Sequence, residues 1–367
     1  MIERNMFSAG VSRRDFMKAV TTATAVMGLP LAMADKVVAA AENPDNRPPV
    51  IWLHFQECTG CSEALLRANH PSVAEVILDL INLEYQETLM AGAGHQAEES
   101  LDNAIKKHAG KYILVVEGSI PKLDNGVCCQ IGGKTAIESF KRCAESAAYV
   151  INLGACATNG GIVAIDPNPT QAFGAPEFMP EGKPYINLPG CPPNPYNLLS
   201  VILYLITFNA LPDLDNQNRP LFAYGRLIHE HCERRAHFDA GRFVREFGSE
   251  EHKLGYCLYH MGCKGPETYA NCSIIKFNDG AAWPIGTGCP CIGCTEGHVL
   301  FKDSLFSLAK VAQPTPNANV PTSSPEGLGK GATSTQTVFV GAAVGLAAGA
   351  GVMYAAKLPK EPEDENK

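Results

Sequence analysis

The chain has 367 residues, 46% of them hydrophobic, with a net charge of −8 and 14 cysteines. This length allows two domains and this composition allows a sizeable core, whereas a negative charge without a basic stripe argues against nucleic acid as a partner. So many cysteines indicate disulfides in an exported protein and metal sites in a cytosolic one, so the compartment has to be determined first.

The N-terminal segment has the features of an export leader. Residues 12–18 read Ser-Arg-Arg-Asp-Phe-Met-Lys, and an uncharged run follows over 19–34. Paired arginines before a mildly apolar stretch, with Ala-x-Ala sites at 32–34 and 39–41, look like a twin-arginine signal over residues 1–41. Because cargo of the twin-arginine export machinery crosses the membrane folded, its thiols can acquire metal in the reducing cytoplasm first.

The first half of the body alternates strand-like and helix-like segments. Near-continuous apolar strands between helical patterns predict a parallel sheet covered on both faces, here an open, flavodoxin-like α/β domain over residues 47–210. The expected strands are 50–55, 112–117, 149–153 and 185–188, and the expected helices are 72–83, 96–108, 135–148 and 197–208.

Four cysteines follow strands of this predicted sheet. Cys58 and Cys61 come after the first strand, and Cys156 and Cys191 come after the third and fourth. Since the carboxyl ends of parallel strands share one edge, these thiols can meet. Four thiolates suit either zinc or a [4Fe–4S] cluster, and spacing alone does not choose between them.

The second half, residues 215–312, has few periodic runs and many Gly, Pro, His and Cys residues. One helix is expected near 240–247. A segment with so little core pattern needs another source of stability, which metal clusters can supply.

Two further cysteine groups occur in this second half. Cys232, Cys257 and Cys263 make a four-ligand site with a histidine, for which His229 is preferred because it lies one helical turn from Cys232, whereas His231 is adjacent to it. A surface histidine is the competing interpretation for either one. The second group contains Cys272, Cys289, Cys291 and Cys294.

The C-terminal part indicates a membrane anchor. Residues 313–337 are rich in Pro, Ser, Thr and Gly and predict a flexible linker. The uncharged segment 331–356 is long enough to span a bilayer, and we place a transmembrane helix at 338–356. Lys357 and Lys360 follow it, so the tail is expected on the cytoplasmic side and the body on the periplasmic side. A buried helix is the alternative.

In this order, the motifs resemble those of the small subunit of membrane-anchored, uptake-type nickel–iron hydrogenases. The resemblance covers almost the whole chain: the leader, E-C-T-G-C-S-E, P-G-C-P-P-N-P, H-x-x-C-x-R-R-x-H-F, G-C-K-G-P-x-T-Y, C-x-G-C and the tail.

The resemblance implies three iron–sulfur clusters in a row. A proximal [4Fe–4S] cluster takes Cys58, Cys61, Cys156 and Cys191; a medial [3Fe–4S] cluster takes Cys272, Cys291 and Cys294; and a distal [4Fe–4S] cluster takes His229, Cys232, Cys257 and Cys263. Pro284 stands where a fourth medial thiol could be. Cys128, Cys129, Cys143 and Cys289 are left over.

The implied function is electron relay within a hydrogenase heterodimer. Hydrogen is split at the nickel–iron centre of the large subunit, a centre that this chain does not contain. Electrons then pass from the proximal to the distal cluster and on to the quinone pool through a membrane cytochrome b or an iron–sulfur membrane partner. Glu57 is a candidate proton relay, with a capping carboxylate as the alternative.

Two departures accompany the resemblance. Cys289 stands where related chains often have histidine, and it could bind the medial cluster, change its type or only line the site. Oxygen-tolerant relatives carry extra cysteines at the positions of Gly60 and Gly161, so this chain is expected to be oxygen-sensitive.

Three other interpretations remain open from the sequence. A zinc-stabilised exported protein would use the same thiols and be colourless. A disulfide-rich secreted domain would lose structure on thiol reduction. A quinone-oxidoreductase subunit related to respiratory complex I would share the first-half fold but lack the leader and the second-half clusters.

Overall fold

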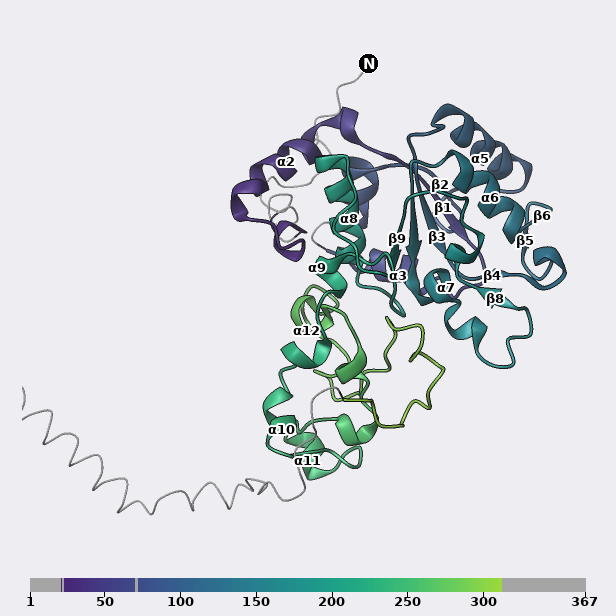
Figure 1. Cartoon of the computed structure of the whole chain (residues 1–367). Coiled ribbons are helices and arrows are strands. Elements are labelled where there is room, and N and C mark those ends of the chain that lie inside the picture. The colour runs from purple at the N-terminus through teal and green to yellow at the C-terminus, as the bar shows by residue number, and fades with distance from the viewer. Residues whose placement is uncertain (1–20, 22, 70–71, 312–367) are drawn as a thin grey trace, which may run out of the picture.

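The protein is described from a computed structural model, which covers residue 21 and residues 23–69 and 72–311 (Figure 1). Its centre is a five-stranded parallel sheet with the order β2-β1-β3-β7-β9. Counted along the chain this is 2-1-3-4-5, the order of flavodoxin-like folds. The predicted open parallel sheet is therefore confirmed. Its strands are β1 (Pro49–His54), β2 (Asn82–Gln86), β3 (Ile113–Glu117), β7 (Tyr149–Leu153) and β9 (Tyr185–Leu188).

Both faces of the sheet are buried, as near-continuous apolar strands require. Trp52 packs into a core shared with α8 (Pro195–Phe208), whereas its neighbour Leu53 packs into a core shared with α5 (His95–Lys107) and α6 (Ala136–Ser146). The alternation follows from the period of two along a strand. These three helices confirm the predictions made for 96–108, 135–148 and 197–208.

The helix starts agree with their sequences. Thr135 accepts a hydrogen bond from the backbone N–H of Glu138, whose side chain in turn accepts one from the backbone N–H of Thr135. This capping box satisfies two backbone donors at the start of α6. Asn194 caps α8 by accepting from the backbone N–H of Tyr196, with Pro195 as the first helical residue.

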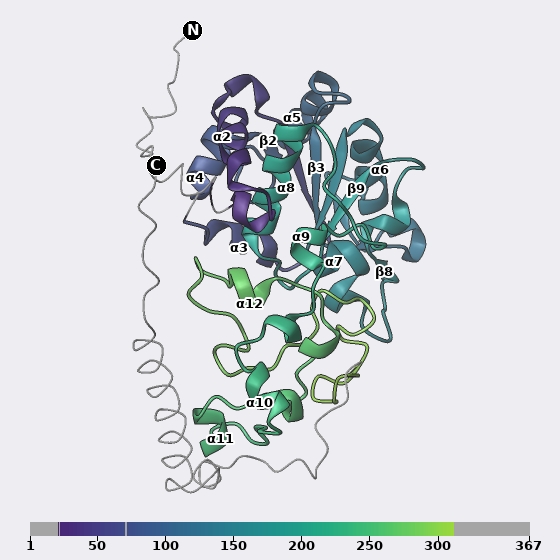
Figure 2. The ribbon, with the colours of Figure 1, turned by 60° about the vertical axis from the view of Figure 1, so that its left-hand side comes forward.

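The second region, residues 211–311, contains short helices and turns joined by irregular backbone (Figure 2). Its main core is shared with the first region, because Ile228, Leu258 and Ile285 belong to the same apolar cluster as α8, and a small separate cluster is formed by Phe238, Cys257, Tyr259 and Ala309. Its short helices are α9 (Leu221–Tyr224), α10 (Arg235–Asp239), α11 (Glu250–Lys253) and α12 (Cys272–Ile275), with 3-10 turns η8 (Ile228–His231), η9 (Tyr259–Met261) and η10 (Gly265–Glu267).

The smaller elements surround the sheet. Two short antiparallel pairs, β4 with β8 and β5 with β6, lie beside it. The remaining elements are η2 (Leu31–Met33), α2 (Ala34–Glu42), η3 (Pro44–Asn46), α3 (Gly60–Leu66), α4 (Val73–Glu75), π-helical η4 (Val76–Leu80), β4 (Ile120–Pro121), η5 (Leu123–Gly126), β5 (Gln130–Ile131), β6 (Lys134–Thr135), α7 (Gly154–Asn159), η6 (Gly161–Ala164), β8 (Ala172–Phe173) and η7 (Ala175–Phe178).

One helix prediction is too long and another is wrong. The expected helix 72–83 ends at Leu80, and the edge strand β2 begins at Asn82, because this apolar run also fits the open edge of β1. The expected helix 240–247 does not form. Gly241 has a φ of +67°, and the backbone N–H of Val244 donates to the carbonyl of Cys257, so the segment is extended and bridged to a cysteine loop.

Several predictions fall on other parts of the chain. The twin-arginine motif at 12–18, the linker 313–337 and the anchor 338–356 lie outside the described residues. Within the part that is described, no helix is both long and apolar enough to cross a bilayer.

Candidate cysteine-rich metal sites

The first site lies at the carboxyl edge of the sheet, where the sequence predicts it. Cys58 and Cys61 stand in the turn from β1 into α3, Cys156 lies in α7 directly after β7, and Cys191 follows β9. The thiols influence one another electrostatically. Burial, the carboxylate of Glu117 and the other three thiols together raise the pKa of Cys61. Three segments far apart in sequence thus bring these four thiols together.

The chemistry of this donor set fits a metal cluster. Burial, with Cys191 as the next cause, raises the pKa of Cys156 to about 11, and burial likewise raises the pKa of Cys191. A bound cation would stabilise the thiolate forms that burial disfavours, with release of protons. The four thiols therefore suit a metal ion or a metal cluster whose positive charge stabilises their thiolate forms.

Glycines let the backbone pass close to these thiols. A Cβ on Gly154 would collide with Sγ of Cys61, and one on Gly161 would lie 2.7 Å from Sγ of Cys156. Both glycines also have positive φ angles, +90° and +52°, which L side chains rarely adopt. Gly60 is similarly close to a thiol, because a Cβ on it would lie 3.1 Å from Sγ of Cys58.

A buried carboxylate that the sequence analysis did not single out holds the Cys58–Cys61 turn. Glu117, at the end of β3, is 1% exposed. Its Oε1 accepts from the backbone N–H groups of Cys61 (3.0 Å) and Ser62 (3.2 Å), and its Oε2 accepts from Ser62 Oγ (2.7 Å) and Trp52 Nε1 (3.2 Å). This set of donors satisfies an otherwise costly buried charge. A carboxylate directly after an apolar strand was the available signal.

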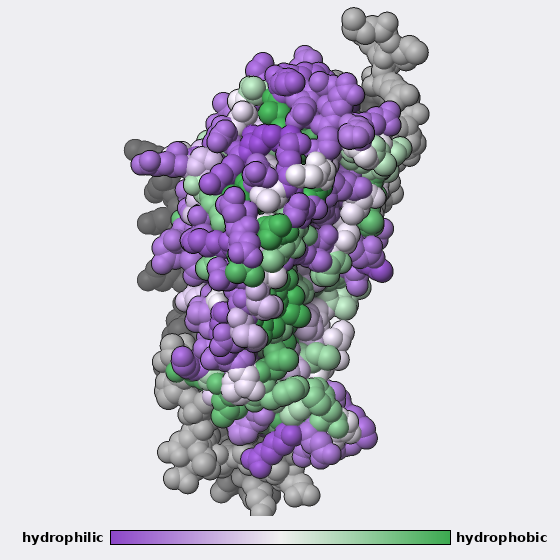
Figure 3. Space-filling view, turned by 90° about the vertical axis from the view of Figure 1, so that its right-hand side faces the viewer, coloured by the Kyte–Doolittle hydropathy of each residue, from purple (hydrophilic) through white to green (hydrophobic). Residues whose placement is uncertain are grey.

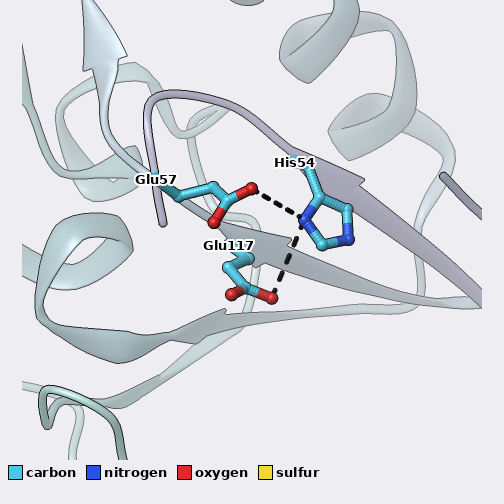
Figure 4. A group of neighbouring side chains, drawn as sticks. All are labelled: His54, Glu57 and Glu117. Carbon is cyan, nitrogen blue, oxygen red and sulfur yellow. Dashed lines mark hydrogen bonds and ion pairs between the residues drawn. The ribbon is translucent and has the colours of Figure 1, made fainter. Parts of the chain in front are cut away.

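Glu57 lies beside this carboxylate, with His54 contacting both (Figure 4). Nδ1 of His54 is 3.3 Å from Oε1 of Glu57 and 3.8 Å from Oε2 of Glu117. Burial first, and then the charge of Glu117, raises the pKa of Glu57. Oε2 of Glu57 is buried without a hydrogen-bond partner among the described residues. Glu57 is thus a carboxyl that can hold a proton.

A second acid lies near Glu57 and was also missed. Burial raises the pKa of Glu87 to about 7, and the charges of Glu98 and Glu57 add to the rise. Tyr85 donates a hydrogen bond of 3.3 Å to Glu87. Two carboxyls with raised pKa values therefore stand near each other at this end of the sheet.

The second site is a small pocket in the irregular region. It is lined by His229, Cys232, Cys257 and Cys263. Nε2 of His229 is buried and has no hydrogen-bond partner among the described residues. Burial first, then Arg235, lowers the pKa of His229, so its imidazole is neutral and able to act as a metal ligand.

The geometry distinguishes His229, which the sequence analysis preferred, from its competitor His231. His229 is 9% exposed and packs edge-on against the ring of Phe238, with 4.4 Å between ring centroids. His231 is exposed, lines a different cavity and lies 3.4 Å from Nη1 of Arg226. Of the two, His229 is the one placed with the three cysteines.

The third site surrounds a cavity of about 530 Å³ between the sheet edge and the irregular region. Cys272, Cys291 and Cys294 line it, and burial raises the pKa of each to about 12. Pro284 and Cys289 line the same cavity, and the backbone N–H of Cys289 donates to the carbonyl of Pro284. The cavity thus holds three thiols, of which Cys291 is buried and Cys272 and Cys294 are half-buried, and the exposed Cys289 stands at its border.

The three sites share walls. Cys191, from the first site, also lines the 530 Å³ cavity. Its charge adds to the effect of burial in raising the pKa of Cys294. Ile285 lines both this cavity and the pocket of His229. The charge of Cys291 adds to the effect of burial in raising the pKa of Cys263. The three sites therefore form a row, with the 530 Å³ cavity in the middle.

The other cysteines lie elsewhere. Cys143 is buried in α6, and Cys128 and Cys129 lie in the turn before β5. None of the three lines the middle cavity or the pocket of His229.

Two family models match the chain. Residues 58–205 match the model described as "NADH ubiquinone oxidoreductase, 20 Kd subunit", and residues 224–307 match the model of the C-terminal part of the NiFe/NiFeSe hydrogenase small subunit. The boundary between the matches falls where the regular α/β region gives way to the irregular one.

Curated relatives cover nearly the whole chain. It is 49% identical over 362 residues to the Hydrogenase-2 small chain of Escherichia coli (strain K12), covering 98% of this chain and 96% of that one. It is 45% identical over 344 residues to the quinone-reactive Ni/Fe-hydrogenase small chain of Wolinella succinogenes, covering 92% and 95%. Among solved structures, the reduced, active Ni-Fe-Se hydrogenase of Desulfomicrobium baculatum superposes with a TM-score of 0.68 at 33% identity, covering 72% of this chain and 100% of the other.

Proposed function

This chain belongs to the family of nickel–iron hydrogenase small subunits, and from that premise we propose that it relays electrons through three iron–sulfur clusters to an acceptor in the membrane. It is part of a hydrogenase enzyme complex, and the family implies a nickel-containing large subunit as its partner. The observation that carries the proposal is the row of three thiol-rich sites with shared walls.

Each site has a ligand set that suits a defined cluster. Four thiols at the sheet edge suit a [4Fe–4S] cluster, and three thiols with one neutral imidazole suit a second. In the middle cavity the three thiols of Cys272, Cys291 and Cys294 suit a [3Fe–4S] cluster, because Pro284 offers no metal-binding side-chain atom at the cavity wall. The assigned ligands are Cys58, Cys61, Cys156 and Cys191; His229, Cys232, Cys257 and Cys263; and Cys272, Cys291 and Cys294.

The clusters supply one-electron carriers, and the chain sets their surroundings. Thiolates are anionic, whereas imidazole is neutral, so His229 leaves one fewer negative charge in its ligand set, which favours the reduced form of that cluster. Buried apolar residues such as Ile285 keep water from the space between neighbouring sites. Glu57, with its raised pKa and unpartnered Oε2, is suited to carry a proton at the sheet edge.

The site at the sheet edge is open on one side, which is where the large subunit would bind. Cys58 and Cys191 are exposed. Nearby, Ile162 and Phe173 remain 53% and 38% exposed. Apolar side chains gather in a band on one face of the molecule (Figure 3). Exposed apolar surface beside an open thiol site is typical of a surface that a partner covers.

The environment of the first cluster favours an oxygen-sensitive enzyme. Gly60 and Gly161 lie directly against Sγ atoms of Cys58 and Cys156. Neither offers a thiol to that cluster, so its ligand set stays at four.

The membrane route rests on the sequence features. We assign residues 1–41 to a twin-arginine leader, 47–210 and 215–312 to the two folded regions, 313–337 to a linker and 338–356 to an anchor. The body is then held at the periplasmic side of the cytoplasmic membrane. The Wolinella relative is named quinone-reactive, which favours a cytochrome b or iron–sulfur membrane protein as the electron acceptor.

Metal analysis of the anaerobically purified complex tests the proposal. We expect about eleven irons and about twelve inorganic sulfides bound by this chain, in addition to the iron of the nickel–iron centre, together with a brown colour and a nickel-containing large subunit that copurifies from membranes. Zinc without sulfide, or intact disulfides without metal, would overturn the assignment in favour of the competing interpretations.

A further inference from the structure

The helix α2, which follows the apolar part of the proposed leader, is built into the folded body. It packs beside α8 (Figure 2), with Val37 0% and Ala41 3% exposed in the core that also contains α8 residues. Nζ of Lys36 lies 4.8 Å from the ring centroid of Phe208, the last residue of α8. Asn46 donates a hydrogen bond to the carbonyl of Ala40. These contacts are those of a structural helix.

The two candidate cut sites differ in what a peptidase can reach. A leader peptidase binds small side chains at the first and third positions before the cut, in the Ala-x-Ala pattern. At the first site, Ala32 is exposed and Ala34 is half-buried. At the second site, Ala39 is exposed but Ala41 is packed into the core. Only the first site presents both side chains.

The backbone favours the same site. Ala34 is the first residue of α2, directly after the short 3-10 turn η2, and no side chain caps this end, so it opens more readily than the packed interior of the helix. The bond after Ala41 lies inside the last turn of α2, and Ala41 fixes that turn against the body. Opening it would require lifting α2 off its neighbours.

We propose that a leader peptidase cuts after Ala34 and that α2 from Asp35 onward becomes the N-terminal helix of the mature subunit. Water adds across the Ala34–Asp35 peptide bond, which leaves a carboxylate on Ala34 and an α-amino group on Asp35. The inference rests on the leader proposed above and shortens the removed part to residues 1–34, but it does not depend on the clusters. The cut also removes Ala23 and Met27, which pack into the same core, while α2 remains to cover α8.

Cleavage at this site uncovers part of a groove. Residues 25–29 form one wall of a cavity of about 1,080 Å³, whose other lining includes Tyr196, Tyr204 and Phe222. In the precursor these leader residues lie against that apolar lining, and the mature chain lacks them.

The mature N-terminus, read from the membrane-purified complex by intact mass and N-terminal sequencing, tests the inference. We expect Asp35 as the first residue. A chain that begins at Glu42 would overturn the inference and leave the leader assignment intact, whereas an uncleaved chain would overturn both. Iron analysis of the same sample reports on the proposed function independently.

Two matched variants test the role of side-chain access. Ala34→Glu should slow conversion of the precursor at least tenfold, because a large charged side chain then occupies the first position before the cut. Ala39→Glu places the same charge at an exposed position of the second site, and it should leave the rate and the start at Asp35 unchanged. The reverse pattern would contradict the inference, and iron content of both variants verifies that they fold.

Discussion

The two regions of the molecule are held together in different ways. In the α/β region, parallel strands and capped helices form a continuous backbone network around two apolar cores. In residues 211–311, the α-helices have four or five residues, and much of the remaining order comes from buried polar contacts such as the ion pair of Arg219 with Glu296, at 2.8 Å. Regular structure positions the cysteines of the first site, whereas in the second region the cysteines themselves lie where chain segments meet.

The largest test of this contrast is removal of the clusters. Stripping iron anaerobically with a chelator should unfold much of residues 215–311, because binding energy at metal sites is folding energy where little other core exists. The strands β1, β3 and β7 should keep most of their protection. Hydrogen exchange before and after chelation measures both regions at once. Equal loss in both, or no loss in either, would show that the regions do not differ in this way.

A smaller effect is expected when one ligand of the second region is removed. His229→Ala should lower the iron content by up to about four per chain, abolish the spectroscopic signal of the distal cluster and slow acceptor reduction, while the other two signals persist. His231→Ala is the matched control and should retain all three, since His231 lies on a different cavity. If the two variants behave alike, the assignment of His229 fails.

Within the α/β region, the buried carboxylate offers a change of intermediate size. The carboxylate of Glu117 accepts four hydrogen bonds, whereas the amide of Glu117→Gln would place its own N–H group opposite N–H or O–H donors. The free energy of unfolding should therefore fall by about 1.5–3 kcal/mol. Thermal unfolding of the complex measures the change. Glu63→Gln, at an exposed position on α3, provides the control. Because the sheet holds β3 in place, the hydrogen-exchange pattern of residues 215–311 should change little.

The smallest expected effect is a pH dependence at Glu87. Its pKa is raised to about 7 in the folded chain, from 4.5, so the folded state binds the proton more tightly. Stability from this group is therefore present below pH 4.5 and is lost as the pH rises to 7. Relative to the wild type, Glu87→Gln should raise the free energy of unfolding by about 1 kcal/mol more at pH 8 than at pH 4.5, after allowance for the partial exposure of Glu87. Thermal unfolding of both proteins at the two pH values measures this difference. The exposed Glu99→Gln should show no such difference.

The sequence predicted the α/β region better than the irregular one. Apolar strands with helical patterns between them define their own secondary structure. Three of the four helices expected there form as predicted, and the fourth forms but ends early, at Leu80. The exceptions arose where the local pattern was ambiguous. The chain from Asn82 to Gln86 pairs with the open edge of β1 and forms a strand, which shortens the helix predicted for 72–83. The segment 240–247 was predicted helical but is extended, because it is bridged to the loop of Cys257.

The candidate sites divide in the same way. The sequence grouped Cys58 and Cys61 with Cys156 and Cys191 because strand ends of a parallel sheet must share an edge. It did not identify Glu117, although its place at the end of an apolar strand was a usable signal. It did not identify Glu87 either, because nothing local marks that acidic residue as buried. The sequence already preferred His229 to His231 from its spacing to Cys232, and the fold separates them, because His229 lines the pocket of the three cysteines and His231 lines a different cavity.

By itself, the sequence determined the family, the parallel sheet and the ligand types, because these depend on local periodicity and on motifs whose order along the chain is fixed. Only the tertiary structure decided which side chains are buried, that the three thiol-rich sites stand in a row, and which alanine pair remains open at the start of α2. Burial and shared walls arise from segments distant along the chain, and their effects on charge and access exist only once those segments are packed.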